Sequence, residues 1–319
     1  MKILIRFAVD DQILASWREG FPTVDFIACD GGAIASEHRD AEVLVGGWEL
    51  DEATVEALPH LRWVQATFTG VESFLGAGLA ERGIALTNFR GVSAPNIAEH
   101  VLATMLAFAR GLPELLRRQA RHEWHPYGAE PPSFELQGQR VGLIGMGEIA
   151  REVAARAKCG FGMDIWGLRR NADLPIPPNF DRVLASDALD ELLTACDHIV
   201  LAPALTPETR GMIDAGRLDA MKDTAWLYNV GRGELVDQDA LVDALRAGKL
   251  AGAALDVTFP EPLPADSPLW DMGNVIITAH SAGPTSRYWD RGYAIFADNI
   301  ARFRAGEPLI NLVDQTLGY

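Results

Sequence analysis

The sequence predicts an α/β protein with two units, each built on a parallel sheet. Short apolar segments alternate with amphipathic helical patterns between residues 2 and 87 and again beyond residue 141. A long helical pattern and a proline-rich stretch separate these two regions. The second region opens on a glycine-rich turn between a strand and a helix, which is typical of a dinucleotide-binding domain. A chain of 319 residues is long enough for two domains with cores of their own.

The first region contains apolar segments that favour strands. They are Lys2–Phe7, Asp25–Ala28, Glu42–Val45, Leu61–Ala66 and Ile84–Thr87. Amphipathic helical patterns such as Asp51–Leu58 and Gly70–Ala80 lie between them. Ligands of open parallel sheets bind at the carboxyl ends of the strands. The loops Gly46-Gly47-Trp48 and Thr67-Phe68-Thr69-Gly70 follow strands and are therefore candidate ligand contacts, although ordinary turns would have the same spacing.

A long helical pattern covers Pro95–Arg121 and is interrupted near Gly111-Leu112-Pro113. A helix of this length can bridge two domains. The next stretch, Trp124–Phe134, contains three prolines and is expected to be irregular. His122 and His125 have an H-x-x-H spacing, and we interpret them as surface residues rather than metal ligands.

The second region begins with a dinucleotide fingerprint in its usual context. Val141–Ile144 is a short apolar run that favours a buried parallel strand, and a helical pattern covers Arg151–Lys158. Between them, Gly145-Met146-Gly147-Glu148-Ile149-Ala150 fits the form G-x-G-x-x-A. Gly145 permits the tight turn, and Gly147 lets a pyrophosphate approach the backbone amides at the start of the helix. This pattern alone is weak, because glycine-rich turns are common.

The remaining elements of the second region predict a doubly wound nucleotide domain. The expected strands are Met163–Leu168, Arg182–Leu184, Ile199–Ala202, Ala225–Asn229, Gly252–Val257 and Val275–Ala279. Helical patterns cover Ala188–Ala195 and Gln238–Ala247. A last helical pattern, Trp289–Phe303, is too short to form a domain, and we expect it to pack on the first unit.

Composition excludes several classes of protein. The net charge of −16 and the pI near 4.8 leave no basic surface for nucleic acid. The sequence has no long apolar run and no leader-like segment, so we expect a cytoplasmic protein that does not bind membranes. Cys29, Cys159 and Cys196 lie far apart without a C-x-x-C motif, which predicts neither a disulfide nor a metal site.

Three stretches that follow predicted strands carry the groups needed to reduce a 2-oxo acid. Arg232 lies in Asn229-Val230-Gly231-Arg232-Gly233 and can bind a substrate carboxylate through two parallel hydrogen bonds. Glu261 lies in a proline-flanked loop, and His280 follows a strand in Thr278-Ala279-His280-Ser281. Hydride reduction of a carbonyl needs an anchor for the acid and a proton donor for the forming alkoxide. An arginine, a histidine and a carboxylate meet those needs.

In these motifs the sequence resembles the D-isomer-specific 2-hydroxyacid dehydrogenase family, including its glyoxylate and hydroxypyruvate reductases. The resemblance runs in order through GLIGMGEIA, LTPETRGMI, LYNVGRGELVD, AALDVTFPEPLPADSPLW and NVIITAHSAG. It implies that Arg232, Glu261 and His280 are catalytic. It also implies two similar Rossmann or flavodoxin-like domains with the active site in a cleft between them, and a homodimer formed around the region that follows Pro95.

The resemblance further implies the division of the chain and its binding residues. Residues 1–96 and 287–319 would form the substrate domain, and residues 97–286 the NADP-binding Rossmann domain. The expected cofactor-binding residues are Gly145, Met146, Gly147, Glu148, Ile149, Arg169, Arg170, Ala202, Pro203, Val230, Gly231, Arg232, Asp256, His280, Ala282 and Gly283. The expected substrate-binding residues are Trp48, Phe68, Thr69, Gly70, Arg232 and His280. No metal is expected.

Two features bear on the choice of cofactor. NAD-preferring domains usually end their second strand with an acid that binds the ribose, whereas this chain has Arg169 and Arg170 there. Asp164 lies at the start of that strand, so we interpret it as structural. Two arginines suit a 2′-phosphate, and we expect NADP(H) to be preferred over NAD(H). Glu148 would repel the pyrophosphate if it faced it, so we expect it to turn to solvent or to pair with a cation such as Arg151.

The two loops expected to face the substrate contain no Lys or Arg, which disfavours a phosphorylated substrate. Trp48 and Phe68 suggest a small or partly apolar 2-oxo acid, such as glyoxylate or hydroxypyruvate, and a D-2-hydroxy acid product. Arg90 or Arg287 could bind a second carboxylate, but surface positions are the simpler interpretation. Two alternatives stay open: a dinucleotide-sensing, corepressor-like binding protein, and an NAD-dependent family member whose donor is formate or phosphite.

Overall fold

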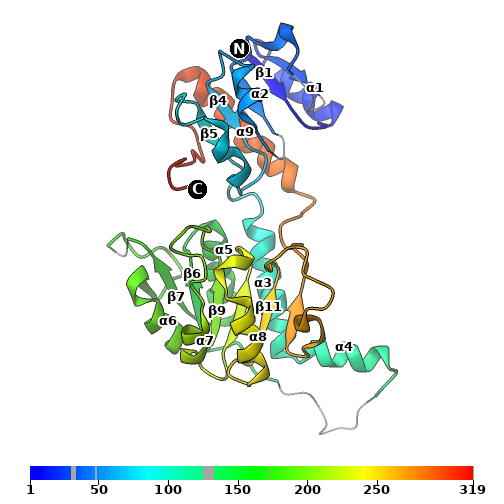
Figure 1. Cartoon of the computed structure of the whole chain (residues 1–319), viewed down its shortest axis with the longest axis vertical. Helices are drawn as coiled ribbons and strands as arrows, with labels where there is room; N and C mark the ends of the chain where they lie inside the picture. Colours follow the sequence, from blue (N-terminus) through cyan, green and yellow to red (C-terminus); the bar gives the residue numbers. More distant parts are fainter. Residues whose placement is uncertain (30–33, 47–48, 125–132, 172, 319) are drawn as a thin grey trace. The chain divides into compact units, whose positions relative to one another are not determined.

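The structure is a computed structural model that describes residues 1–29, 34–46, 49–124, 133–171 and 173–318. It divides into a first unit, Met1–Val92 with Ser286–Tyr319, and a second unit, Ser93–Thr285 (Figure 1). From the sequence, the boundaries between the two domains were expected after residues 96 and 286. The first boundary lies earlier in the structure, because the whole helix that starts at Ala94 belongs to the second unit.

Within its described residues, the first unit contains a five-stranded parallel sheet of order β2-β1-β3-β4-β5. The strands are β1 Lys2–Ile5, β2 Asp25–Ala28, β3 Val43–Val45, β4 Trp63–Gln65 and β5 Ala85–Thr87. The helices are α1 Asp11–Gly20, α2 Glu52–Glu56, α9 Tyr288–Ala305 and the 3-10 helices η1 Ser36–His38 and η2 Glu72–Ala77. The expected strands are confirmed, but Gly70–Ala80 forms η2 instead of an α-helix. Gly76 and Gly78 weaken a regular helix there.

The core of the first unit lies on both faces of this sheet. Alternate strand residues point to opposite faces, so Leu4 and Leu44 pack in one cluster and Ile3 and Val43 in the other. Phe296 of α9 is fully buried in the second cluster. The final helix therefore packs on the first unit, as the sequence predicted.

Within its described residues, the second unit contains a seven-stranded parallel sheet of order β12-β11-β10-β9-β6-β7-β8 (Figure 1). The strands are β6 Arg140–Ile144, β7 Asp164–Arg169, β8 Arg182–Ala185, β9 His198–Leu201, β10 Trp226–Asn229, β11 Gly252–Leu255 and β12 Val275–Ile277. Each of them was expected from the sequence, and the doubly wound fold is confirmed. The strand order reverses at β6, which lies between β7 and β9, and ligands of such sheets bind at this switch point.

The described residues of the second unit also form helices, most of which pack on the sheet. They are α3 Ala94–Ala109, α4 Leu112–Ala120, α5 Glu148–Phe161, α6 Leu189–Ala195, α7 Ala215–Ala220, α8 Gln238–Arg246 and the 3-10 helices η3 Ser186–Ala188, η4 Gly233–Leu235 and η5 Pro268–Asp271. The predicted interruption near residue 111 is confirmed, because α3 ends at Ala109 and Gly111 adopts a left-handed conformation with φ 62°. The short α7 was not predicted. Among the residues that the structure describes, no helix is long and apolar enough to cross a membrane.

Candidate active site

The glycine-rich turn after β6 forms a cradle of backbone atoms. Gly145 has φ +88°, and a Cβ there would lie 2.6 Å from the backbone of Pro203, in the loop after β9. Gly147 is the N-cap of α5, and a Cβ on it would meet nothing within 4 Å. The first amides of a helix have no intrahelical partner and favour anions. The space beside Gly147 therefore suits the pyrophosphate of a dinucleotide.

The loop after β10 packs against the loop after β9, beside this cradle. A Cβ on Gly231 would lie 2.8 Å from Leu235 Cδ1 and 3.3 Å from the Pro203 carbonyl oxygen. The expected cofactor residues Ala202, Pro203, Val230 and Gly231 thus lie in loops that touch one another at the carboxyl ends of β9 and β10. These residues have small or compact side chains that leave room for a ligand, so the residues present fit a bound dinucleotide.

Arg169 ends β7, at the edge where the adenosine ribose of a dinucleotide would bind. Its Nη2 donates to the carbonyl oxygens of Leu174 and Pro175, and its Nε is buried without a hydrogen-bond partner among the described residues. Arg170 interacts electrostatically with Glu208, whose pKa is lowered mainly by its hydrogen bond with Thr206 and, to a smaller extent, by Arg170.

The two carboxylates near the fingerprint have local partners. Asp164, at the start of β7, accepts hydrogen bonds from Arg140 Nε at 2.7 Å and from Trp166 Nε1 at 3.2 Å. Glu148 Oε1 accepts a hydrogen bond from Arg151 Nη1 at 3.2 Å, which is the pairing expected from the sequence. Both acids therefore have positions that the sequence interpretation anticipated.

Glu261 and His280 form a hydrogen-bonded pair at the carboxyl ends of β11 and β12. His280 Nδ1 lies 2.9 Å from Glu261 Oε2, and the other carboxylate oxygen, Oε1, accepts a hydrogen bond from the Thr258 amide at 3.1 Å. The carboxylate thus has a fixed orientation. It engages one ring nitrogen and leaves Nε2 as the nitrogen that can deliver a proton.

Arg232 is brought to the same edge by a tightly packed turn. A Cβ on Gly233 would collide with the Thr258 carbonyl, so only glycine lets this turn press against the loop that carries Glu261. The buried Asn229 shapes the turn, because its Nδ2 donates to the Arg232 carbonyl at 2.9 Å and its Oδ1 accepts from the Gly231 amide at 3.1 Å. The three expected catalytic residues therefore lie on adjacent strand ends.

Asp256 organises the loop that contains His280. Its buried Oδ1 accepts hydrogen bonds from Thr278 Oγ1 at 2.6 Å, from the Ser281 amide at 2.9 Å and from the Ala282 amide at 3.1 Å. Its carbonyl oxygen accepts from the His280 amide at 2.6 Å. The sequence interpretation assigned Asp256, Ala282 and Gly283 only to cofactor binding, whereas the structure gives the first two a direct role in holding this loop.

Sequence reasoning missed two polar residues on the first turns of α3. Asn96 Nδ2 donates to the carbonyl oxygens of Ala282 at 2.6 Å and Gly283 at 2.9 Å. His100 Nε2 lies 3.0 Å from Thr278 Oγ1. Neither residue was among the expected site residues. Their spacing of four residues places both on one side of the helix. In the sequence, this spacing of two polar residues was the feature that could have indicated a shared role.

The expected substrate loop after β4 lies in the first unit and is held by its carbonyl groups. The Thr67 carbonyl accepts from Tyr288 Oη at 2.7 Å, the Phe68 carbonyl from the Phe89 amide at 3.1 Å, and the Thr69 carbonyl from Asn88 Nδ2 at 2.8 Å. These bonds hold the backbone of Thr67, Phe68 and Thr69. Trp48, the other expected contact, lies outside the described residues.

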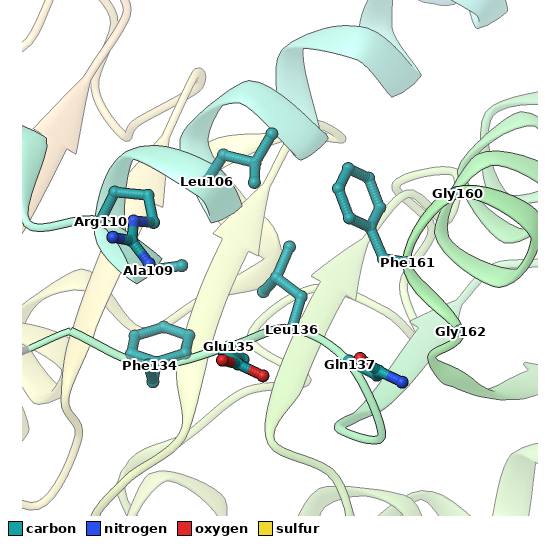
Figure 2. A pocket seen from close by; sticks show the side chains of 10 residues that line it. All are labelled: Leu106, Ala109, Arg110, Phe134, Glu135, Leu136, Gln137, Gly160, Phe161 and Gly162. Carbon is teal, nitrogen blue, oxygen red and sulfur yellow. The ribbon is translucent and has the colours of Figure 1, made fainter.

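A separate pocket of about 460 Å³ lies at the other end of the second sheet (Figure 2). Its lining residues are Leu106, Ala109, Arg110, Phe134, Glu135, Leu136, Gln137, Gly160, Phe161 and Gly162. They come from the end of α3, the segment before β6 and the end of α5. The cofactor cradle follows β6 at its carboxyl end, so this pocket does not belong to the candidate active site.

Comparison with known proteins agrees with this arrangement. Residues 102–282 match the family described as D-isomer specific 2-hydroxyacid dehydrogenase, NAD binding domain. The chain is 34% identical over 315 residues to glyoxylate/hydroxypyruvate reductase B of Pectobacterium carotovorum, covering 97% of this chain and 94% of that protein. It is 36% identical over 275 residues to glyoxylate reductase of Korarchaeum cryptofilum, covering 83% and 80%.

A solved structure extends the likeness to the fold. The D-isomer specific 2-hydroxyacid dehydrogenase of Xanthobacter autotrophicus, in complex with NADPH and MES, has a TM-score of 0.83 and 30% identity, and the match covers 100% of this chain and 99% of that chain. Family pattern, relatives and fold agree with the motifs and the strand-end geometry. The chain therefore belongs to the D-isomer-specific 2-hydroxyacid dehydrogenase family.

Proposed function

We propose that this protein is an NADPH-dependent reductase that converts a small 2-oxo acid, of the glyoxylate or hydroxypyruvate type, to the D-2-hydroxy acid. The observation that carries this proposal is the pair formed by His280 and Glu261, which follow β12 and β11, beside the strand β10 that precedes Arg232. The same sheet carries the dinucleotide cradle at its switch point. Relatives named as glyoxylate and hydroxypyruvate reductases support the substrate class.

Each group has one task in the proposed reaction. A bound nicotinamide supplies the hydride. Arg232 pairs with the substrate carboxylate and orients the carbonyl. His280 donates the Nε2 proton to the carbonyl oxygen as it gains charge, and Glu261 holds the ring through Nδ1 so that Nε2 faces the substrate. In this proposal the backbone amides near Phe68, Thr69 and Gly70 complete the site for the substrate carboxylate.

The residues at the end of β7 support a preference for NADPH. Arg169 and Arg170 stand where an acid would bind the ribose hydroxyls, and the buried Nε of Arg169 has no hydrogen-bond partner among the described residues, which a phosphate oxygen would supply. Arg169 also donates hydrogen bonds to the carbonyl groups of Leu174 and Pro175 and so holds the loop that follows β7. We therefore assign the 2′-phosphate to both arginines, with Arg170 as the one whose removal affects NADPH alone.

The proposed substrate carries one carboxylate and no phosphate. Neither Gly46-Gly47-Trp48 nor Thr67-Phe68-Thr69-Gly70 has a cation that would pair with a second anion. In this proposal the first unit binds the substrate and the second unit binds the cofactor. These tasks follow from the loops and the cradle that each unit contains.

We also propose that two copies of the chain associate through α4. This helix buries no residue, Leu112 and Leu116 are 42% and 61% exposed, and Trp124 beyond its end is 98% exposed. Apolar side chains that gather on one exposed helix mark an interface. A second copy of the chain is the proposed occupant because α4 lies in the region that follows Pro95.

Initial rates with NADPH and with NADH, each with saturating glyoxylate or hydroxypyruvate, test the proposal. We expect NADPH to be preferred, Arg170→Ala to lose most of that preference, and Arg169→Asp to impair both cofactors. Arg246→Ala, at the end of α8, is the control and keeps the wild-type ratio. Equal use of both cofactors by the wild type would refute the phosphate assignment. Cofactor binding without turnover would favour a sensor, and NAD-dependent oxidation of formate or phosphite would favour the other alternative.

A further inference from the structure

We propose that Thr278 and His100 are positioning residues that hold the His280 loop in its reactive conformation. The inference deepens the proposed function and rests on it for the role of His280. All of these residues lie in the second unit.

The backbone that presents His280 is strained. Ala279 and His280 are consecutive residues with φ of 47° and 57°, in the left-handed region that residues with a Cβ adopt at a cost. Such a pair persists only where surrounding contacts determine it. Without those contacts the loop would relax, and the ring of His280 would move away from Glu261.

Asp256 supplies most of those contacts. Its side chain accepts the amides of Ser281 and Ala282, the two residues that follow the strained pair. Its carbonyl accepts the amide of His280 itself. The orientation of one carboxylate therefore determines the path of the loop on both sides of His280.

Thr278 links this carboxylate to α3. A carboxylate only accepts hydrogen bonds, so the short contact of 2.6 Å commits the Thr278 hydroxyl proton to Asp256 Oδ1. The oxygen of that hydroxyl must then accept from His100 Nε2, which lies 3.0 Å away. The chain of bonds from His100 through Thr278 to Asp256 fixes the tautomer of His100 and the rotation of the carboxylate.

The same helix holds the far end of the loop. Asn96, one turn before His100, donates to the carbonyl groups of Ala282 and Gly283. Side chains of α3 thus form hydrogen bonds with the loop at residue 278 and again at residues 282 and 283. Since a displacement of a catalytic group by about 1 Å can reduce the rate about 100-fold, these bonds matter for proton transfer by His280.

A pair of substitutions at Thr278 separates the hydroxyl from the shape of the side chain. Thr278→Val keeps the shape and removes the hydroxyl, whereas Thr278→Ser keeps the hydroxyl. Thr194→Val is the matched control, because within the described part of the chain the Thr194 hydroxyl bonds to carbonyl groups of its own helix α6. The measurements are kcat, KM for the 2-oxo acid, the Kd of NADPH and amide hydrogen exchange over residues 278–283.

For Thr278→Val we expect kcat to fall by about 30-fold or more, a larger change than in KM or in the Kd of NADPH. Exchange of the Ser281 and Ala282 amides should rise by about 10-fold or more. Thr278→Ser should restore both kcat and exchange. His100→Gln, which loses the ring nitrogen, should resemble the valine variant in a weaker form.

Two results would overturn the inference: wild-type kcat and exchange in Thr278→Val, or a serine variant as impaired as the valine variant. Hydrogen exchange needs no substrate and therefore remains informative if the wild type reduces no 2-oxo acid. In that case the proposed function fails, while exchange alone decides whether the hydroxyl holds the loop.

Discussion

The Nδ1 atom of His280 lies 2.9 Å from Oε2 of Glu261, although 19 residues separate them in the chain. Strands β11 and β12 pair in parallel, and therefore their carboxyl ends meet at one edge of the sheet. The loops that follow these strands bring the two side chains together. The register of the sheet therefore brings the two residues together. Replacing either of them should change kcat more than it changes the affinity for ligands.

Replacing either member of this pair should lower turnover much more than it weakens cofactor binding. We expect His280→Ala to lower kcat by about 100-fold to 10,000-fold, because it removes the proton donor. Glu261→Gln keeps the shape but loses the charge, and its loss should be smaller. Steady-state kinetics would measure kcat, and fluorescence titration the Kd of NADPH. A variant that binds NADPH more than about 10-fold more weakly would show instead that the residue serves binding.

Replacing Gly147 should weaken cofactor binding and leave the free protein stable. A Cβ at this position meets no atom of the chain within 4 Å, and Gly147 has an ordinary φ of −79°. Gly147→Ala should therefore melt within about 2 °C of the wild type. The methyl group would occupy the space of the pyrophosphate, so the Kd of NADPH should rise by about 10-fold or more.

Gly160→Ala provides the control for this experiment. Gly160 also has open space around its Cβ position, but it lies near the opposite end of α5. We expect its NADPH affinity to equal that of the wild type. If both variants bound NADPH normally, the pyrophosphate would not lie beside Gly147.

The stability of the second unit should fall in mild acid because of His198. This histidine is fully buried between Tyr228 Oη at 2.9 Å and Gln139 Oε1 at 2.6 Å, and burial lowers its pKa from 6.5 to about 4. Between these two pKa values the unfolded chain binds a proton that the folded chain does not. Stability is therefore lost as the pH falls from 6.5 towards 4, by about 2 kcal/mol between about pH 7 and pH 5.

Urea unfolding at the two pH values, in the wild type and in His198→Gln, would measure this effect. The variant cannot titrate at this position, so the pH dependence of its free energy of unfolding should be about 2 kcal/mol smaller. His60→Gln, at an exposed position, should behave like the wild type. Parallel pH dependence in all three proteins would contradict the assignment.

A charge on the exposed face of α4 should separate the proposed dimer. Leu116 is 61% exposed on a helix that buries no residue of its own. Leu116→Glu would place an unpaired carboxylate in the interface, at a cost of several kcal/mol. Light scattering should then give about half of the wild-type mass. Leu174→Glu, which is exposed elsewhere in the second unit, should leave the mass unchanged, and a monomeric wild type would refute the interface.

Sequence periodicity predicted the strands of both units well, because each parallel strand is a short apolar run bounded by turn residues. It was less successful for short helices. The stretch Gly70–Ala80 has the spacing of an amphipathic helix but forms the 3-10 helix η2, and α7 was not recognised. A single helical turn has too few apolar positions for a period, so its existence depends on packing against neighbours.

The sequence by itself determined the family, the two α/β units and the residue types of the candidate site, because these depend on local patterns within a few residues. Only the tertiary structure decided which groups meet: Asp256 accepts hydrogen bonds from the amides after His280, and α3 holds that loop through Asn96 and His100. The physical reason is that a hydrogen bond depends on distance and direction. For residues 100 and 278 these are set by how a helix packs beside a sheet and not by any spacing along the chain.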